Sequence, residues 1–407
     1  MTDVSSLLSA RAVRERAHQL LALGLDDKLP HFRIDLGKLD AIADLVRDVT
    51  NKAYPRGEVP FHSRWRHFVV GGIDRWAEIA VKTQWPDAAA RARAEFDLAI
   101  ASVLLDAGAG AAWRYQDAVT GAKIGRSEGL ALASLDMFVS GAFSSDAKDP
   151  MRADAAKLQQ LTVADLERGF QVGPDNPLVG LEGRVALLRR LGEVTAAKPE
   201  IFGTKDAPRP GGLFDQLAVG ARNGHIDAAS ILQQVLLQLG PIWPSRLTLQ
   251  GIALGDCWRH ASLVTGDETT GLVPLHKLSQ WLSYSLIEPL QGAGLMVDNI
   301  DGLTGLAEYR NGGLFVDGGV LSLRNPADAT RAHEVDSPLV VEWRALTVAL
   351  LDRLAALIRQ RTGQSAEQRP LARILEGGTW AAGRKLAFAR RPDGSPPLTI
   401  ISDGTVF

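Results

Sequence analysis

The chain has 407 residues, of which 46% are hydrophobic and 23% charged; this is the composition of a folded globular protein and excludes a disordered chain. The 45 lysines and arginines nearly balance the 47 aspartates and glutamates, and the net charge of −2 gives no reason to expect nucleic acid or an anionic membrane as a partner. The N-terminal segment lacks the apolar run of a signal peptide, and no run is long enough to span a membrane, so we expect a cytoplasmic protein.

Apolar residues recur at helical spacing along most of the chain, which predicts a mainly α fold. Thr162 precedes Val163 and is expected to cap a helix, because its hydroxyl can accept an orphan backbone N–H. The helix that starts at Lys277 is expected to stop before Pro289, because an interior proline removes a helical hydrogen bond. In chain order, helices are expected over residues 5–23, 36–49, 88–105, 127–139, 184–194, 228–239, 277–287, 341–359 and 371–387.

Strand signals are few and short. Residues 295–297, 314–316, 320–323 and 398–401 are apolar runs bounded by glycine or aspartate. They are expected to form one small sheet or hairpin, near 295–323 and 398–407, beside the helical body. Since the chain shows no fixed repeat and no long linker, we predict a single continuous, mostly helical domain over residues 1–407.

Acidic residues and glycines are concentrated in the segment DNIDGLTGLAEYRNGGLFVDGGVL, which begins at Asp298. Glycines allow turns that approach a ligand closely, and carboxylates such as Glu308 can act as a general acid or base. Arg310 can orient Glu308 and keep it ionised. A structural loop made of caps and turns is an equally good interpretation of this pattern.

Four further segments contain candidate ligand-binding side chains. They are FHSRWRHFVVGGIDRW with Arg66, WRYQDAVTGAKIGRSEGLA with Trp113 and Tyr115, GDCWRHASL with Arg259 and His260, and VPLHKLSQWLSYSLIEPL with His276 and Lys277. Arginine and lysine bind phosphate or carboxylate, and aromatic rings offer stacking faces. For each segment, a capped helix or an aromatic anchor in the core is the alternative interpretation.

The sequence contains no standard metal or nucleotide motif. There is no HExxH, EF-hand or Walker A pattern, and the acids around His333 fit no standard ligand set. The single cysteine, Cys257, cannot form an internal disulfide and is more typical of a small buried hydrophobe than of a nucleophile. We therefore expect neither a metal nor a cofactor.

Several long strings resemble the uracil-catabolism protein family of fungi and bacteria, which belongs to the URC pathway of pyrimidine degradation. They are RWRHFVVGGIDR, GDCWRH, PLHKLSQWLSYSLIEPLQ, DGLTGLAEYRNGGLFVDGGVL, HEVDSPLVVEWRALTVALLD, LEGGTWAAGR and SDGTVF. The resemblance spans nearly the whole chain. It implies a pathway in which the pyrimidine ring is opened while it is still attached to ribose, and in which the N-glycosidic bond of a ribosylurea must then be broken to release urea.

The order of elements also resembles the queuosine-salvage nucleosidase family, helical proteins similar to helix-hairpin-helix DNA glycosylases. In that resemblance residues 113–121 match an aromatic loop, Lys277 a pocket-lining lysine, residues 308–310 an Asp-Tyr-Arg triplet, and Asp403 a C-terminal acid. The sequence departs from the family at Glu308, which is one methylene longer than aspartate. It departs again at residues 311–313, where Asn-Gly-Gly replaces Val-Pro-Gln and suggests a smaller or differently shaped base pocket.

Together the resemblances imply an N-glycosyl hydrolase that acts on ribosylurea, with its 5′-phosphate as the expected substrate. Glu308 would hold the attacking water or stabilise the sugar cation, with Asp403 or Asp298 as its partner. The implied binding residues fall into four groups: Arg310 beside Glu308; Lys277, Arg259 and Arg66 for phosphate; His276 and His260 as further contacts; and Trp113 and Tyr115 as walls.

Two alternatives remain open at this stage. One is a metal-assisted amidohydrolase that acts on the ureido group. The other is a non-enzymatic partner that binds the ring-opening enzyme and shields its product. Besides a small-molecule substrate, contact with other enzymes of uracil catabolism is therefore considered.

Overall fold

The computed structural model describes residues 4–106, 108–110, 112–203, 207–243 and 247–401. Backbone packing divides the chain into two compact units. The first unit comprises Met1–His62, Ser245–Gln280 and Asn299–Phe407, and the second comprises Ser63–Pro244 and Trp281–Asp298. The prediction of a single continuous domain stays a prediction.

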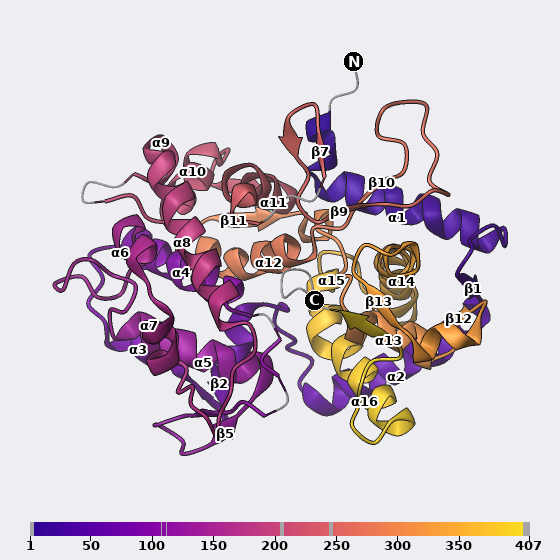
Figure 1. Ribbon diagram of the computed structural model, residues 1–407, viewed down its shortest axis with the longest axis horizontal. Coiled ribbons are helices and arrows are strands. Elements are labelled where there is room, and N and C mark those ends of the chain that lie inside the picture. Colours follow the sequence, from indigo (N-terminus) through magenta and orange to yellow (C-terminus); the bar gives the residue numbers. More distant parts are fainter. Residues whose placement is uncertain (1–3, 107, 111, 204–206, 244–246, 402–407) are drawn as a thin grey trace. The chain divides into compact units, whose positions relative to one another are not determined.

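The first unit is built around the long helix α14 (Pro338–Thr362). Almost every residue in its first four turns is buried, including the charged residues Glu342 and Arg344. Ser337 caps its start, and Gly363 ends it with a φ of +65°. Helices α1, α2 and α13 pack against α14 (Figure 1). The other helices of this unit are α1 (Ala10–Leu25), α2 (Leu39–Ala53), α13 (Tyr309–Asp317), α15 (Leu371–Ile374) and α16 (Trp380–Arg390).

A π-helical segment, Leu375–Thr379, joins α15 to α16. Its two glycines lie against α2, and a methyl group added to Gly377 or Gly378 would collide with Thr50 at 2.9 or 2.6 Å. The close approach of the backbones therefore requires glycine here. The sequence predicts one helix over 371–387, and the helical path is found with this π segment inside it.

The second unit is also mainly helical. Helix α4 packs against α5, α8 and α10, and α6 lies along α8 (Figure 1). Thr162 caps α7 in a reciprocal arrangement with Asp165, as its position in the sequence predicts. The helices are α3 (Arg75–Lys82), α4 (Ala88–Leu104), α5 (Arg126–Val139), α6 (Ala155–Gln160), α7 (Val163–Gly169), α8 (Leu181–Ala197), α9 (Pro199–Phe202), α10 (Gly212–Gly220) and α11 (Ala228–Gln234).

The chain passes from the first unit to the second within α12 (Lys277–Gly292). The prediction that this helix stops before Pro289 is wrong. Proline cannot donate to the carbonyl of Ser285, one turn earlier, but that oxygen accepts a hydrogen bond from the indole N–H of Trp65 at 2.7 Å. Because a side chain replaces the missing backbone donor, the helix continues to Gly292.

In the part of the chain that the structure describes, the strands are two or three residues long and each pairs with one other strand. β11 joins β6, β12 joins β1 and β14 joins β13, so the predicted single sheet near 295–323 and 398–407 is wrong. Residues 314–316 lie in α13 rather than in a strand. The pairs are β1 (Phe32–Ile34) with β12 (Leu321–Leu323), β2 (Val69–Val70) with β3 (Ile73–Asp74), β4 (Tyr115–Gln116) with β5 (Lys123–Ile124), β6 (His225–Asp227) with β11 (Met296–Asp298), β7 (Thr248–Leu249) with β8 (Ile252–Ala253), β9 (Cys257–Arg259) with β10 (Leu272–Pro274), and β13 (Ala332–Glu334) with β14 (Thr399–Ile401).

The mainly helical fold expected from the sequence is thus confirmed. The expectation that Gly312 and Gly313 form a turn close to a ligand is wrong. Gly312 and Gly313 belong to α13 and do not form a loop. A methyl group at Gly312 would lie 2.7 Å from the ring of Trp343, and one at Gly383 in α16 would collide with the carbonyl of Arg310. These glycines let α13 pack closely between α14 and α16.

Candidate functional site

Glu308 is the N-terminal cap of α13. Its Oε2 accepts a hydrogen bond from the backbone N–H of Arg310 at 2.5 Å, and its Oε1 accepts one from that of Asn311 at 2.6 Å. The residue is 9% exposed. Burial raises the pKa of Glu308, whereas the backbone donors and the charges of Lys277 and His62 act against that rise. The carboxylate is therefore held in a fixed position and lies within the field of two basic side chains.

An ion pair fixes the start of the helix that carries Lys277. The backbone N–H of Lys277 donates to Asp256 Oδ2 at 2.9 Å, and the buried guanidinium of Arg344 holds both Asp256 oxygens at 2.8 Å. Although burial alone would raise it, the charge of Arg344 holds the pKa of the Asp256 carboxyl well below its usual range. Arg344 Nε also donates to the carbonyl of Ala307 at 3.2 Å, directly before Glu308. One arginine thus links the backbones that carry Lys277 and Glu308.

Three residues that the sequence analysis did not predict as site residues belong to this cluster. His62 Nδ1 donates to Glu376 Oε2 at 2.8 Å, and the Tyr54 hydroxyl donates to Glu376 Oε1 at 2.9 Å. Glu376 lies in the π-helical segment, and such segments occur frequently at functional sites. The string LEGGTW, quoted above for its resemblance, is the signal that could have pointed to Glu376.

The expected role of Arg310 beside Glu308 is corrected by the structure. Its Nη1 donates to the carbonyl of Gly394 at 2.7 Å, and its guanidinium lies 4.9 Å from the ring centre of Tyr309. The backbone of Arg310, and not its guanidinium, contacts the carboxylate of Glu308. Orientation of Glu308 therefore comes from the cap geometry.

The two histidines expected to contact substrate lie within the packing of the first unit. His260 Nε2 is 3.1 Å from Glu342 Oε2, and His276 Nε2 is 3.0 Å from the carbonyl of Leu7. Both residues are at most 2% exposed. Burial lowers the pKa of His276, which favours its neutral form. Arg259, which was expected to bind phosphate, lies exposed on β9. Its side chain therefore faces water, whereas those of His260 and His276 do not.

Cys257 precedes Trp258 on β9 and is completely buried. Burial raises the pKa of its thiol to about 12. The thiol is therefore protonated near neutral pH, which fits a small apolar core residue rather than a nucleophile. In the part of the chain that the structure describes, no three His, Cys, Asp or Glu side chains lie close enough together to hold a metal ion.

Trp113 and Tyr115, expected as pocket walls, belong to the second unit. Trp113 is fully buried, and its indole N–H donates to the carbonyl of Phe170 at 2.9 Å. The Tyr115 hydroxyl donates to Asp136 Oδ2 at 2.7 Å, and burial raises the pKa of Tyr115. Both aromatic side chains thus stabilise the packing of α5 and its neighbouring loops.

Arg66 and Asp298 also lie in the second unit, where each has a partner. Arg66 Nη2 donates to Glu288 Oε1 at 2.6 Å, and Asp298 accepts from His225 Nδ1 at 2.7 Å. Asp403 lies outside the described residues. The structure thus brings together Glu308 and Lys277 among the predicted site residues and adds His62, Tyr54 and Glu376 to them.

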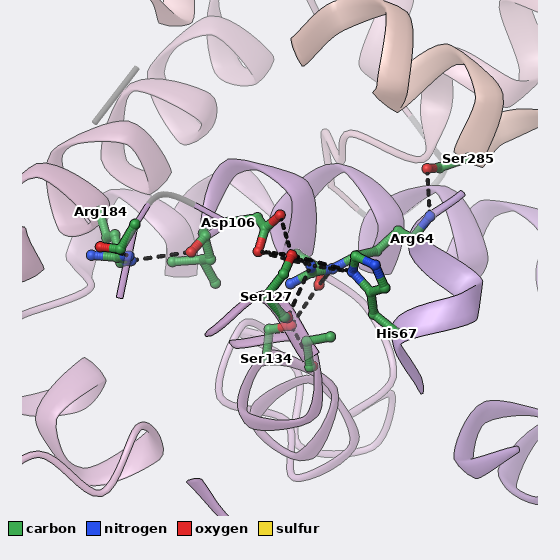
Figure 2. Close-up of polar contacts among 11 residues, drawn as sticks. Arg64, His67, Asp106, Ser127, Ser134, Arg184 and Ser285 are labelled. Carbon is green, nitrogen blue, oxygen red and sulfur yellow. Dashed lines mark hydrogen bonds and ion pairs between the residues drawn. The ribbon is translucent and has the colours of Figure 1, made fainter. Parts of the chain in front are cut away.

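A second polar cluster surrounds the fully buried guanidinium of Arg64 in the second unit (Figure 2). Arg64 Nη1 lies 3.0 Å from Asp106 Oδ1 and 3.2 Å from His67 Nδ1. The Ser127 hydroxyl donates to the two Asp106 oxygens at 2.5 and 2.6 Å and lies 3.3 Å from His67 Nδ1. A serine, a histidine and an aspartate therefore meet at one place.

The order of contacts in this cluster differs from that of a nucleophilic triad. In a triad the histidine accepts the serine proton and the aspartate holds the histidine. Here Asp106 accepts directly from Ser127, and Arg64, which can only donate, occupies Nδ1 of His67. The ring centre of Trp281 lies 5.6 Å from the Arg64 guanidinium. The cluster is thus a buried anchor that joins the Arg64–Phe68 turn to α5.

Among the described residues, no helix is both long enough and apolar enough to cross a membrane.

The model of the family described as "Protein of unknown function (DUF1688)" matches residues 6–407. The chain is 40% identical to Protein urg3 of Schizosaccharomyces pombe, and the alignment covers 99% of both chains. It is 36% identical to uracil catabolism protein 4 of Lachancea kluyveri, again over 99% of both chains.

The match to that second relative confirms the resemblance to the uracil-catabolism protein family, whereas the resemblance to queuosine-salvage nucleosidases stays a prediction. The family model spans nearly the whole sequence, and two relatives align over their full length. The chain therefore belongs to the DUF1688 family.

Proposed function

We propose that this protein acts in uracil catabolism and hydrolyses the N-glycosidic bond of ribosylurea, with the 5′-phosphate as its preferred substrate. The name of the Lachancea kluyveri relative supports the pathway. The observation that carries the reaction is the buried carboxylate of Glu308, which is fixed by two backbone donors and lies within the field of Lys277 and His62.

The chemistry needs such a carboxylate. As the bond between C1′ and the urea nitrogen breaks, its electron pair leaves with the nitrogen and the sugar becomes an oxocarbenium-like cation. The ionised Glu308 stabilises this cation and accepts a proton from the water whose oxygen bonds to C1′. The charge of Lys277 favours the ionised form of Glu308 and offers a contact for the substrate phosphate.

A urea-release assay tests this function. The full-length protein is incubated with synthetic ribosylurea and with its 5′-phosphate, with and without a chelator. From the 5′-phosphate, urea and ribose phosphate are expected in equal amounts. The rate is expected to be the same with and without the chelator. Ammonia in place of urea, or a rate abolished by chelator, would support the amidohydrolase. No turnover by folded protein would support the non-enzymatic partner.

The Glu308→Gln variant identifies the carboxylate. It retains one acceptor oxygen for the cap but loses the charge and the proton acceptor, so the rate of urea release should fall by about 10²–10⁴-fold. Glu334→Gln is the matched control, because Glu334 is an exposed carboxylate on β13 of the same unit, and it should leave the rate unchanged. Equal rates for the wild type and Glu308→Gln would contradict the assignment.

A further inference from the structure

His62 and Glu376 are separated by 314 positions in the sequence, yet their side chains meet in a partly buried pair. The side chains of His62 and Glu376 are 13% and 16% exposed. Glu376 accepts from His62 through one oxygen and from Tyr54 through the other. The carboxylate is thereby locked in orientation, and it fixes the imidazole in turn.

The hydrogen bond to Glu376 decides which nitrogen of His62 can exchange a proton. A carboxylate can only accept, so Nδ1 carries the hydrogen in this contact. Nε2 is then the nitrogen at which a proton enters or leaves the ring. A general acid must carry the proton that it donates, and the carboxylate of Glu376 lies directly beside the ring of His62.

His62 lies close enough to Glu308 for its charge to act on that carboxylate. Glu376 from the π-helical segment bonds His62, and Tyr54 from the end of α2 bonds the same carboxylate. Glu308 at the start of α13 lies within the range at which the charge of His62 acts on it. A proton acceptor and a proton donor thus stand in one cluster, which is the pairing that bond cleavage with a poor leaving group demands.

We propose that His62 is the general acid that protonates the leaving urea nitrogen, with Glu376 and Tyr54 as positioning residues. This inference rests on the proposed N-glycosidase function and names the second catalytic group of the same site.

The step is balanced with water as the only co-reactant. The C1′–N bond breaks, and its electron pair takes up the Nε2 proton of His62 to give neutral urea. The water oxygen bonds to C1′ and its proton passes to Glu308. Afterwards Glu308 is protonated and His62 is neutral, and exchange of one proton with solvent restores both.

Two leaving groups separate acid catalysis from a structural role. The full-length wild type and His62→Gln are compared on ribosylurea 5′-phosphate and on p-nitrophenyl ribofuranoside 5′-phosphate, whose leaving group departs without protonation. Urea release by the variant should fall by about 10²–10⁴-fold, while nitrophenolate release should stay within about threefold of the wild type. His18→Gln is the control, because His18 forms a similar pair with Asp352 at 2.9 Å, and both rates should be unchanged.

Each outcome assigns the failure to one claim. If His62→Gln releases urea at the same rate as the wild type, the role of His62 is overturned and the proposed function stays intact. Equal losses on both substrates would also overturn it, because they indicate damage to the site. No urea release by the wild type would overturn the proposed function and this inference together.

The Glu376→Gln variant gives an independent measurement that does not need the second substrate. It keeps an acceptor for His62 but removes the negative charge beside the ring. The alkaline limb of the pH–rate profile should shift to lower pH by about one unit. An unmoved limb with a uniformly lower rate would show that Glu376 does not act through the protonation of His62.

Discussion

The side chain of Arg344 joins two segments of the first unit that are distant in the sequence. Its guanidinium binds Asp256 through two hydrogen bonds and the carbonyl of Ala307 through a third. Because Arg344 is 1% exposed, loss of its partner would leave a buried charge without compensation. The backbones before Glu308 and at Lys277 depend on this one contact.

The Asp256→Asn variant should therefore lower the free energy of unfolding by about 3 kcal/mol. It should also slow urea release, since the start of α12 loses its anionic anchor. Chemical denaturation measures the first effect. The control is Asp26→Asn, which removes an exposed pair with Lys28 and should change stability by less than about 0.5 kcal/mol. Similar effects of the two variants would contradict the central role of Arg344.

The same ion pair predicts an acid dependence with a definite sign. The folded-state pKa of Asp256 lies below that of an unfolded aspartate, about 3.9. Its contribution to stability is complete above that value and is lost as the pH falls toward the folded-state pKa. The wild type should lose more stability than Asp256→Asn between about pH 5 and pH 3.

At the scale of elements, the sequence predicted helices well where apolar spacing is regular. The limits expected for α4 and α5 agree with the structure to within one residue. Pro289 misled the prediction because the sequence does not show that Trp65, distant along the chain, supplies the missing donor. Residues 314–316 looked like a strand because they are apolar, but the cap at Glu308 starts a helix before them.

The candidate site was predictable only in part for the same reason. Glu308 and Lys277 stand out in quoted segments, whereas the pairing of His62 with Glu376 joins residues 314 positions apart. Helical periodicity contains no information about such a contact. His260 and Trp113 have buried partners 82 and 57 positions away, which local sequence patterns do not reveal either. These residues therefore looked as available for substrate as Lys277 did.

The close packing of α13 makes a prediction about glycine. The Gly312→Ala variant places a methyl group 2.7 Å from the ring of Trp343 and should destabilise the protein by about 1–3 kcal/mol. Gly183→Ala is the opposite case, because Gly183 is an exposed residue of α8 with no atom within 4 Å of the new methyl group. That variant should stabilise the protein by about 0.5–1 kcal/mol, since alanine favours helix. Thermal unfolding of both variants tests the difference in sign.

At the scale of the whole molecule, the buried His276 and the half-buried His31 should set the response to mild acid. Burial lowers the pKa of both His31 and His276 in the folded protein, while an unfolded histidine titrates near 6.5. As the pH falls below about 6.5 the unfolded chain binds protons first, so stability declines until the folded-state pKa values are reached.

The His276→Gln variant should flatten this decline by up to about 1.4 kcal/mol per pH unit. Denaturation midpoints between about pH 7.5 and pH 5.5 provide the measurement. His225→Gln, which changes a half-exposed histidine, should keep the wild-type slope. A His276→Gln slope equal to that of the wild type would show that His276 does not contribute to the acid response.

The cap of α13 has a consequence for the timing of catalysis. The amino end of a helix carries a partial positive charge, which favours an anionic group there by about 0.3–1 kcal/mol. In the proposed reaction Glu308 takes a proton from water, and its neutral form then no longer benefits from the helix dipole. The dipole therefore favours release of that proton and return of Glu308 to the anion. The same helix end that holds the carboxylate in place would thus prepare it for the next turnover.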